Sequence, residues 1–236
     1  MSLTYSASLS TLTEDERLGA ELARDHISIL YRTRSGGQLR KLHLAWHKIL
    51  IHEFQSTHSD VISLPSGLAT KLKRQLAAHC QSVAELNSEG GIPYRLDYDE
   101  NEVLFRDGKW LPDRVGAGLT CATFVLAVFN AQRLPLLTVS EWPRRTYDVP
   151  TKGQSGRLVE DEHRQRKLLE KLRTYYEREQ LNVKDLDSQE RAIGGPRFRP
   201  EEVAVGVASS APPIGFLEAA SAGRELLSML PKDGQT

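Results

Sequence analysis

Residues 116–129 constrain the fold more than any other stretch, because two glycines, a threonine and a cysteine there run into an almost unbroken apolar segment. The segment 120–132 predicts a helix that is apolar on most sides, and such a helix has to be buried by other elements. Thr120 is an acceptable N-cap residue, which places Cys121 in the first turn. Free backbone N–H groups and the helix dipole at that end favour a thiolate. Cys121 is therefore a candidate nucleophile, although a small core cysteine fits the same pattern.

Two strand-like runs earlier in the chain predict a β-hairpin. Residues 25–32 and 39–51 are rich in β-branched and aromatic side chains, and Gly36 and Gly37 lie between them. In such a hairpin His26 lies near the start of the first strand and His43 well along the second. The two imidazoles can therefore approach each other across the strand pair.

The other segments before residue 150 predict a mixture of helices and short strands. Residues 13–22 favour a short helix capped by Thr13, with acidic residues in its first turn. Residues 68–86 have apolar side chains at helical spacing, and Cys80 falls on or beside that stripe, which indicates a core cysteine. Residues 92–96 and 103–106 are candidates for short strands. The first 150 residues therefore predict an α+β domain.

The composition changes near residue 150. Residues 150–156 resemble a linker. A highly charged helix is predicted over 158–181, and further helices are predicted from Pro200 and over 216–230. We therefore expect two parts: a domain over 1–150, and a mostly helical extension over 151–236 that packs on the domain or covers it.

The composition excludes several classes of function. Lys and Arg together number 31, as do Asp and Glu, so no net charge attracts nucleic acid or an anionic membrane. No apolar stretch approaches the ~18 residues of a membrane span, and the first residues do not resemble a signal peptide. Two cysteines do not make a disulfide framework. A cytoplasmic protein with a free thiol is the simplest expectation.

Several histidines are alternatives to the hairpin pair. His47 follows Trp46 and is a rival candidate for a catalytic base. His43 and His47 have the same strand parity, but the sequence has no Cys-x-x-Cys, no His-Glu-x-x-His and no carboxylate cluster, so neither a metal site nor a cofactor is predicted. The remaining histidines are expected to be surface or hydrogen-bonded residues: His52, His58, His79 and His163.

The order of these motifs resembles that of a known family. Cysteine hydrolases need a thiolate at a helix start, a histidine that moves the proton, and a polar group that orients the histidine. Residues 25–31, the glycine turn and residues 41–44 resemble the "His-x-x-Ile-Tyr … Val-x-His" hairpin of permuted NlpC-like papain-fold enzymes. Residues 120–125 resemble the cysteine helix of that family, and Pro93-Tyr94 resembles the lead-in to it. The family includes the lecithin retinol acyltransferases and YiiX-like hydrolases, and the resemblance covers about residues 22–132.

The resemblance implies a permuted papain-like fold, in which an antiparallel sheet packs on the helix that carries the cysteine. It implies Cys121 as nucleophile, His26 as general base and His43 as the residue that orients His26. The backbone N–H of Cys121 is expected to be one oxyanion donor.

The residues after Cys121 lack the Glu-His of the lecithin retinol acyltransferase pattern, which favours hydrolysis of a peptide or other amide, or of an ester. Two alternatives stay open: a non-catalytic protein-binding module on the same fold, and a lipid or thioester acyltransferase.

Overall fold

The computed structural model describes residues 12–55, 60–113, 116–143, 155–193 and 195–230. In this part of the chain it is a mixed α+β structure, built on a five-stranded antiparallel sheet in the order β4-β3-β2-β1-β5. The strands are β1 (Leu18–Ala23), β2 (His26–Tyr31), β3 (Arg40–Trp46), β4 (Ile49–Phe54) and β5 (Ile62–Pro65). The short pair β6 (Phe105–Arg106) and β7 (Lys109–Trp110) forms a separate ribbon.

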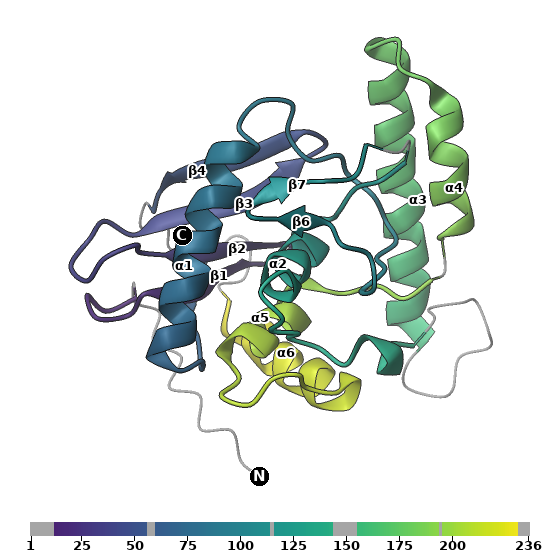
Figure 1. The fold of residues 1–236 in the computed structure, drawn as a ribbon. Coiled ribbons are helices and arrows are strands. Elements are labelled where there is room, and N and C mark those ends of the chain that lie inside the picture. The colour runs from purple at the N-terminus through teal and green to yellow at the C-terminus, as the bar shows by residue number, and fades with distance from the viewer. Residues whose placement is uncertain (1–11, 56–59, 114–115, 144–154, 194, 231–236) are drawn as a thin grey trace.

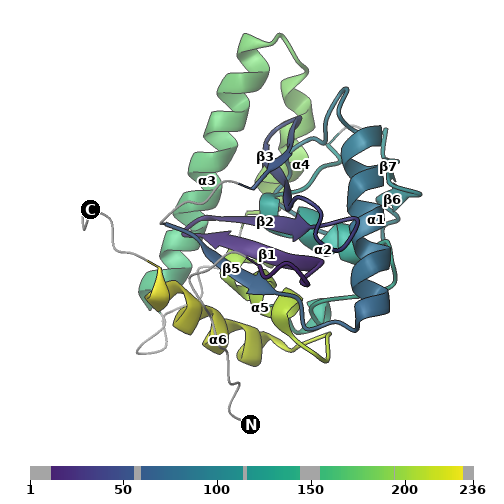
Figure 2. The same cartoon turned by 90° about the vertical axis from the view of Figure 1, so that its left-hand side faces the viewer.

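Six α-helices accompany the sheet in the described residues. They are α1 (Thr70–Leu86), α2 (Cys121–Asn130), α3 (Ser155–Arg178), α4 (Asp187–Arg191), α5 (Pro200–Ala208) and α6 (Phe216–Met229). Short 3₁₀ turns lie at Val139–Glu141 and Val183–Leu186. Figures 1 and 2 show α1, α2 and α5 packed along the sheet and α3 with α4 standing at one side of it.

The main core lies between the sheet and the helices α1, α2 and α5. Alternate side chains of β2, including Ile27 and Ile29, point into this core because successive residues of a strand face opposite sides. Helix α2 contributes nine buried residues out of ten, which accounts for its apolar sequence. The largest core cluster also contains Val203 of α5 and Leu226 of α6, so residues on both sides of position 150 build it.

The first predicted helix is wrong. The segment that carries it forms a turn at Thr13 followed by β1, which lies between β2 and β5. Leu18, Ala20 and Leu22 alternate into the core with no exposed surface, so a period of two overrides the capping signal. Gly19 allows the close approach of β5, since a Cβ there would lie 2.4 Å from the carbonyl oxygen of Leu64.

The predicted hairpin is confirmed, with one difference. Its second run is not one strand but two, because a turn at residues 47–48 separates β3 from β4. Helix α1 is confirmed with Cys80 fully buried on its apolar face. Residues 92–96 form no regular strand, and the linker over 150–156 lies largely outside the described residues.

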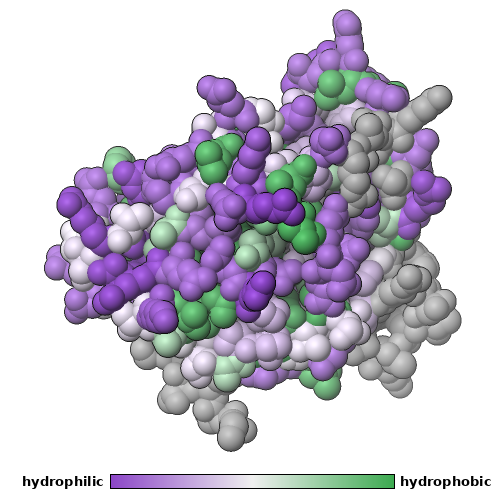
Figure 3. Space-filling view, in the orientation of Figure 1, coloured by the Kyte–Doolittle hydropathy of each residue, from purple (hydrophilic) through white to green (hydrophobic). Residues whose placement is uncertain are grey.

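One face of the molecule is largely polar. Figure 3 shows hydrophilic residues over most of one face, with apolar residues in separate small areas between them. None of the helices in the described part is both long and apolar enough to cross a membrane.

Candidate active site

The candidate nucleophile is the first residue of α2. The N-cap is Thr120, whose side-chain oxygen accepts a hydrogen bond of 3.1 Å from the backbone N–H of Thr123. The Thr123 hydroxyl accepts one of 2.7 Å from the backbone N–H of Thr120 in return. This reciprocal cap satisfies two N–H groups and fixes the helix start, so Cys121 is held in the first turn as the sequence predicts.

Gly118 allows residues 93–95 to lie against the start of α2. The backbone N–H of Leu119 donates to the carbonyl oxygen of Pro93 over 2.9 Å, and the N–H of Arg95 donates to the carbonyl of Leu119 over 3.3 Å. A Cβ at Gly118 would lie 2.6 Å from the Pro93 oxygen, so only glycine permits this approach. The result is that Tyr94 lies beside Cys121.

The thiol of Cys121 is contacted by β2 and by Tyr94. The backbone N–H of Ile27 in β2 faces the thiol and acts to lower its pKa, and the Tyr94 hydroxyl lies against both the thiol and the backbone N–H of Cys121. Burial nevertheless raises the pKa of the Cys121 thiol, and the side chain is only 7 % exposed. The thiol is therefore protonated at neutral pH unless a base removes its proton.

His26 and His43 lie together on neighbouring strands. The Nε2 atom of His26 and the Nδ1 atom of His43 are 2.6 Å apart, and the ring planes meet at 76°. The register explains this contact: Ile29 pairs with Leu42, so His43 lies opposite the residue two places after His26. Within the described residues, the other ring nitrogen of His26, Nδ1, has no hydrogen-bond partner.

Burial keeps both imidazoles neutral. Burial is the main cause that lowers the pKa of His26 and of His43 to about 4 each. The positive charge of Lys41 contributes to both shifts, and the neighbouring His26 contributes to that of His43. A hydrogen bond between two neutral rings needs one N–H donor and one bare nitrogen. If His26 donates from Nε2, its Nδ1 is the bare nitrogen and can accept a proton.

The strand that carries His26 reaches the thiol through its backbone. Ile27 follows His26 directly, and the N–H of Ile27 faces the sulfur while its side chain points into the core. The ring of His26 has its hydrogen bond to His43 and not to the thiol. The structure thus joins His26 to His43, and brings Cys121 to the residue next to His26.

His47 lies away from the thiol. The pairing of β3 with β4 shifts register between Leu44 and Trp46, so the strand parity expected for His43 and His47 does not hold beyond the shift. The Nδ1 atom of His47 accepts a hydrogen bond of 3.2 Å from the backbone N–H of Tyr94. Its ring packs against Tyr175 of α3 at a centroid distance of 5.1 Å. The contacts of His47 therefore support Tyr94 and α3.

The other histidines have separate surroundings. His52 hydrogen-bonds to the Tyr31 hydroxyl over 2.7 Å, as expected of a satisfied residue, and His163 is exposed. His79 differs from that expectation, since it is buried in α1 with no partner for Nε2 in the described residues. His58 lies outside the described residues. Nowhere in the described chain do three or more His, Cys, Asp or Glu side chains gather so as to hold a metal ion.

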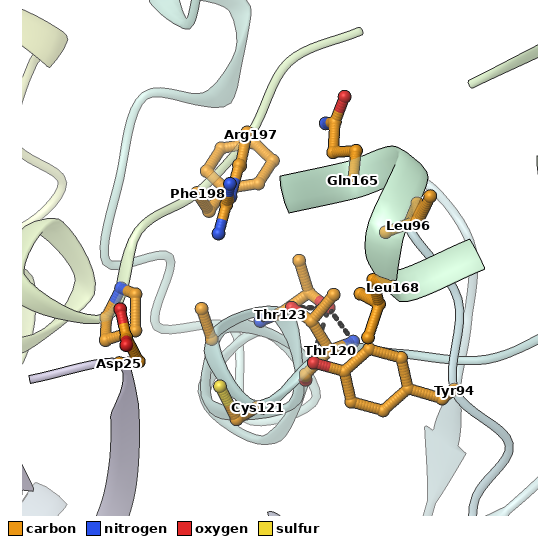
Figure 4. A pocket seen from close by; sticks show the side chains of 12 residues that line it. Asp25, Tyr94, Leu96, Thr120, Cys121, Thr123, Gln165, Leu168, Arg197 and Phe198 are labelled. Atoms are coloured by element: carbon orange, nitrogen blue, oxygen red, sulfur yellow. Dashed lines mark hydrogen bonds between the residues drawn. The ribbon is translucent and has the colours of Figure 1, made fainter. Parts of the chain in front are cut away.

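A small pocket of about 70 Å³ opens beside Cys121 (Figure 4). One wall carries Asp25, from the turn before β2. Another carries Tyr94 and the hydroxyl-bearing start of α2. The remaining walls come from the C-terminal half of the chain, as Gln165 and Leu168 of α3 and as Arg197 with Phe198 in the segment before α5. No sequence pattern points to these last residues, because they form no motif and lie more than forty positions from the cysteine.

Comparison with known proteins does not identify a family for this chain. No family model matches the chain, and no curated protein or solved structure shows significant similarity to it.

Proposed function

We propose that the chain is a permuted papain-like cysteine hydrolase that cleaves an amide or peptide bond through an acyl-enzyme on Cys121. The observation that carries this proposal is the pair His26–His43, 2.6 Å apart on neighbouring strands, together with the Ile27 N–H, next to His26, which faces the thiol. The architecture is compatible with it, since α2 begins at the cysteine and packs on β2 and β3.

The proposed reaction begins from a neutral thiol and a neutral imidazole. His26 takes the thiol proton on Nδ1 while His43 holds its Nε2, and the sulfur attacks the substrate carbonyl carbon. The carbonyl oxygen becomes an oxyanion near the backbone N–H of Cys121. His26 then gives the proton to the leaving nitrogen as the carbon–nitrogen bond breaks. Water, deprotonated by His26, hydrolyses the resulting thioester and restores the thiol.

Tyr94 supplies a second group at the oxyanion position. Its hydroxyl already interacts with the Cys121 backbone N–H, the group that an oxyanion would contact. Burial raises the pKa of Tyr94, so the hydroxyl stays protonated and can donate a hydrogen bond. Donors aimed at a developing charge are among the largest contributions to catalysis.

The test uses thiol alkylation and amide cleavage together. We expect iodoacetamide to alkylate Cys121 near neutral pH and to leave the fully buried Cys80 unmodified, as peptide mapping would show. His26→Ala should slow the alkylation of Cys121, and cleavage of a fluorogenic peptide-amide library should fall about 10²–10⁴-fold in that variant. Cys121→Ala should abolish cleavage, whereas Cys80→Ala should retain it. Unchanged turnover in Cys121→Ala, or alkylation of Cys121 no faster than of Cys80 between pH 6 and 9, would overturn the proposal.

A non-catalytic binding module on the same fold is the second candidate. The observation that favours it is the burial of the thiol, which raises the pKa of Cys121 while the His26 ring is bound to His43. Such a module would leave both cysteines equally slow to alkylate, so the same experiment separates the two functions.

A further inference from the structure

The pocket beside Cys121 is built by two distant parts of the chain, and the second part brings a positive charge. Arg197 lies in the short segment that joins α4 to α5, and Figure 4 shows its side chain directed from the upper wall towards the start of α2. The adjoining Phe198 is buried and its ring packs 5.4 Å from that of Trp142. This packing fixes the backbone from which Arg197 projects.

The interior of the pocket favours a negative group. The start of α2 contributes the positive end of a helix dipole, and the charge of Arg197 acts on both Cys121 and Tyr94. Among the described lining residues, Asp25 carries the opposite charge, but it is exposed to water on the facing wall. Water screens an exposed carboxylate more than it screens a half-buried guanidinium. The pocket therefore places an arginine side chain and the positive end of a helix dipole near the thiol.

The pocket has room for a small organic group. A volume of about 70 Å³ is several times what one water molecule needs. A carboxylate on a short carbon stem fits this volume. The planar guanidinium of arginine can also bind a carboxylate with two parallel hydrogen bonds.

We propose that Arg197 is a specificity-determining residue that binds a carboxylate next to the scissile bond, so the substrate is an amide or peptide with an acidic group at that position. This inference rests on the proposed function, which it deepens by naming the substrate class. It assigns the segment before α5 to substrate selection and not only to the cover of the pocket.

Two small alkylating reagents test the inference without a known substrate. Iodoacetate and iodoacetamide both form a carbon–sulfur bond with loss of iodide, and they differ in that only iodoacetate carries a carboxylate. The rate of Cys121 alkylation by each is measured by intact mass spectrometry in a Cys80→Ala background. The ratio of the two rates is divided by the same ratio for N-acetylcysteine amide, a thiol without a carboxylate, which removes the intrinsic difference in reactivity.

We expect the corrected ratio to favour iodoacetate in the parent protein and to fall about tenfold in Arg197→Gln, because a charged hydrogen bond is lost. Arg197→Lys should retain part of the preference, and added salt should reduce it. The matched control Arg191→Gln removes an exposed arginine of α4 and should leave the ratio unchanged. His26→Ala should slow both reagents and leave the ratio intact.

The outcomes separate the inference from the proposed function. Alkylation of Cys121 with no preference for iodoacetate, or with the same ratio in Arg197→Gln, would overturn the inference and leave the nucleophile in place. A ratio that changes equally in Arg191→Gln would also overturn it, since general surface charge would then be the cause. No alkylation of Cys121 by either reagent would overturn both.

Discussion

At the scale of single residues, the hydroxyl of Tyr94 is the group whose chemistry can be isolated most cleanly. Its ring packs against Trp46 at a centroid distance of 5.1 Å, while its hydroxyl interacts with Cys121. Tyr94→Phe keeps the ring and removes the hydroxyl. We therefore expect almost unchanged stability together with a loss of oxyanion stabilisation of about 10–100-fold.

The measurement for Tyr94→Phe is the inhibition constant of a peptide aldehyde, which forms a reversible tetrahedral adduct with a thiol. The affinity for the aldehyde should fall, whereas the rate of iodoacetamide alkylation should change little because alkylation forms no oxyanion. Equal aldehyde affinity in the two proteins would remove Tyr94 from the proposed mechanism.

At the scale of elements, the contact between residues 93–95 and the start of α2 decides where Tyr94 lies. Gly118→Ala would place a Cβ 2.6 Å from the Pro93 carbonyl oxygen, which is backbone and has to move. We expect a loss of about 1–3 kcal/mol in the free energy of unfolding, as for other overpacked sites. We also expect a weaker affinity for the peptide aldehyde, because Tyr94 moves with Pro93.

Gly36→Ala is the control for this element. Gly36 has a φ of 63° and open space around it, so the substitution adds left-handed strain at the hairpin turn without a clash. It should lower the free energy of unfolding by about 1 kcal/mol and leave the affinity for the peptide aldehyde unchanged. If both variants weaken aldehyde binding to the same extent, the contact at Gly118 does not position Tyr94.

Several elements could be predicted from the sequence alone. The buried cysteine helix, the long apolar stripe of α1 and the hairpin with its paired histidines each follow from a local period or a glycine turn, and the structure contains them. The proximity of His26 and His43 needed only strand alternation and an approximate register.

The features that the sequence did not predict depend on contacts between distant segments. β1 lies where a helix was expected, because its place between two strands favours a period of two over a capping signal. The register shift that turns His47 towards Tyr94 arises from the pairing of two strands. Arg197 reaches the pocket only through the packing of the segment before α5, which no local pattern encodes.

At the scale of the whole molecule, buried neutral histidines should make the fold sensitive to acid. Burial lowers the pKa of His26, His43 and His47 to about 4 each, against 6.5 for an exposed histidine. Between these two values the unfolded chain binds protons that the folded chain refuses. The free energy of unfolding is therefore highest above about pH 6.5 and decreases as the pH falls towards 4.

His47 is the histidine that isolates this effect, because it lies outside the proposed catalytic pair and is only 1 % exposed. The neutral state of His47 should lower the free energy of unfolding at pH 5 by on the order of 1–2 kcal/mol relative to pH 7.5. Urea unfolding at pH 7.5 and pH 5 measures the loss in the parent protein. His47→Asn keeps a hydrogen-bond acceptor for the Tyr94 N–H but has no proton to bind, so its stability should fall less between the two pH values. If the free energy of unfolding falls equally in both proteins, the fold does not hold His47 neutral. The packing of α3 on Tyr94 is then independent of the charge of His47.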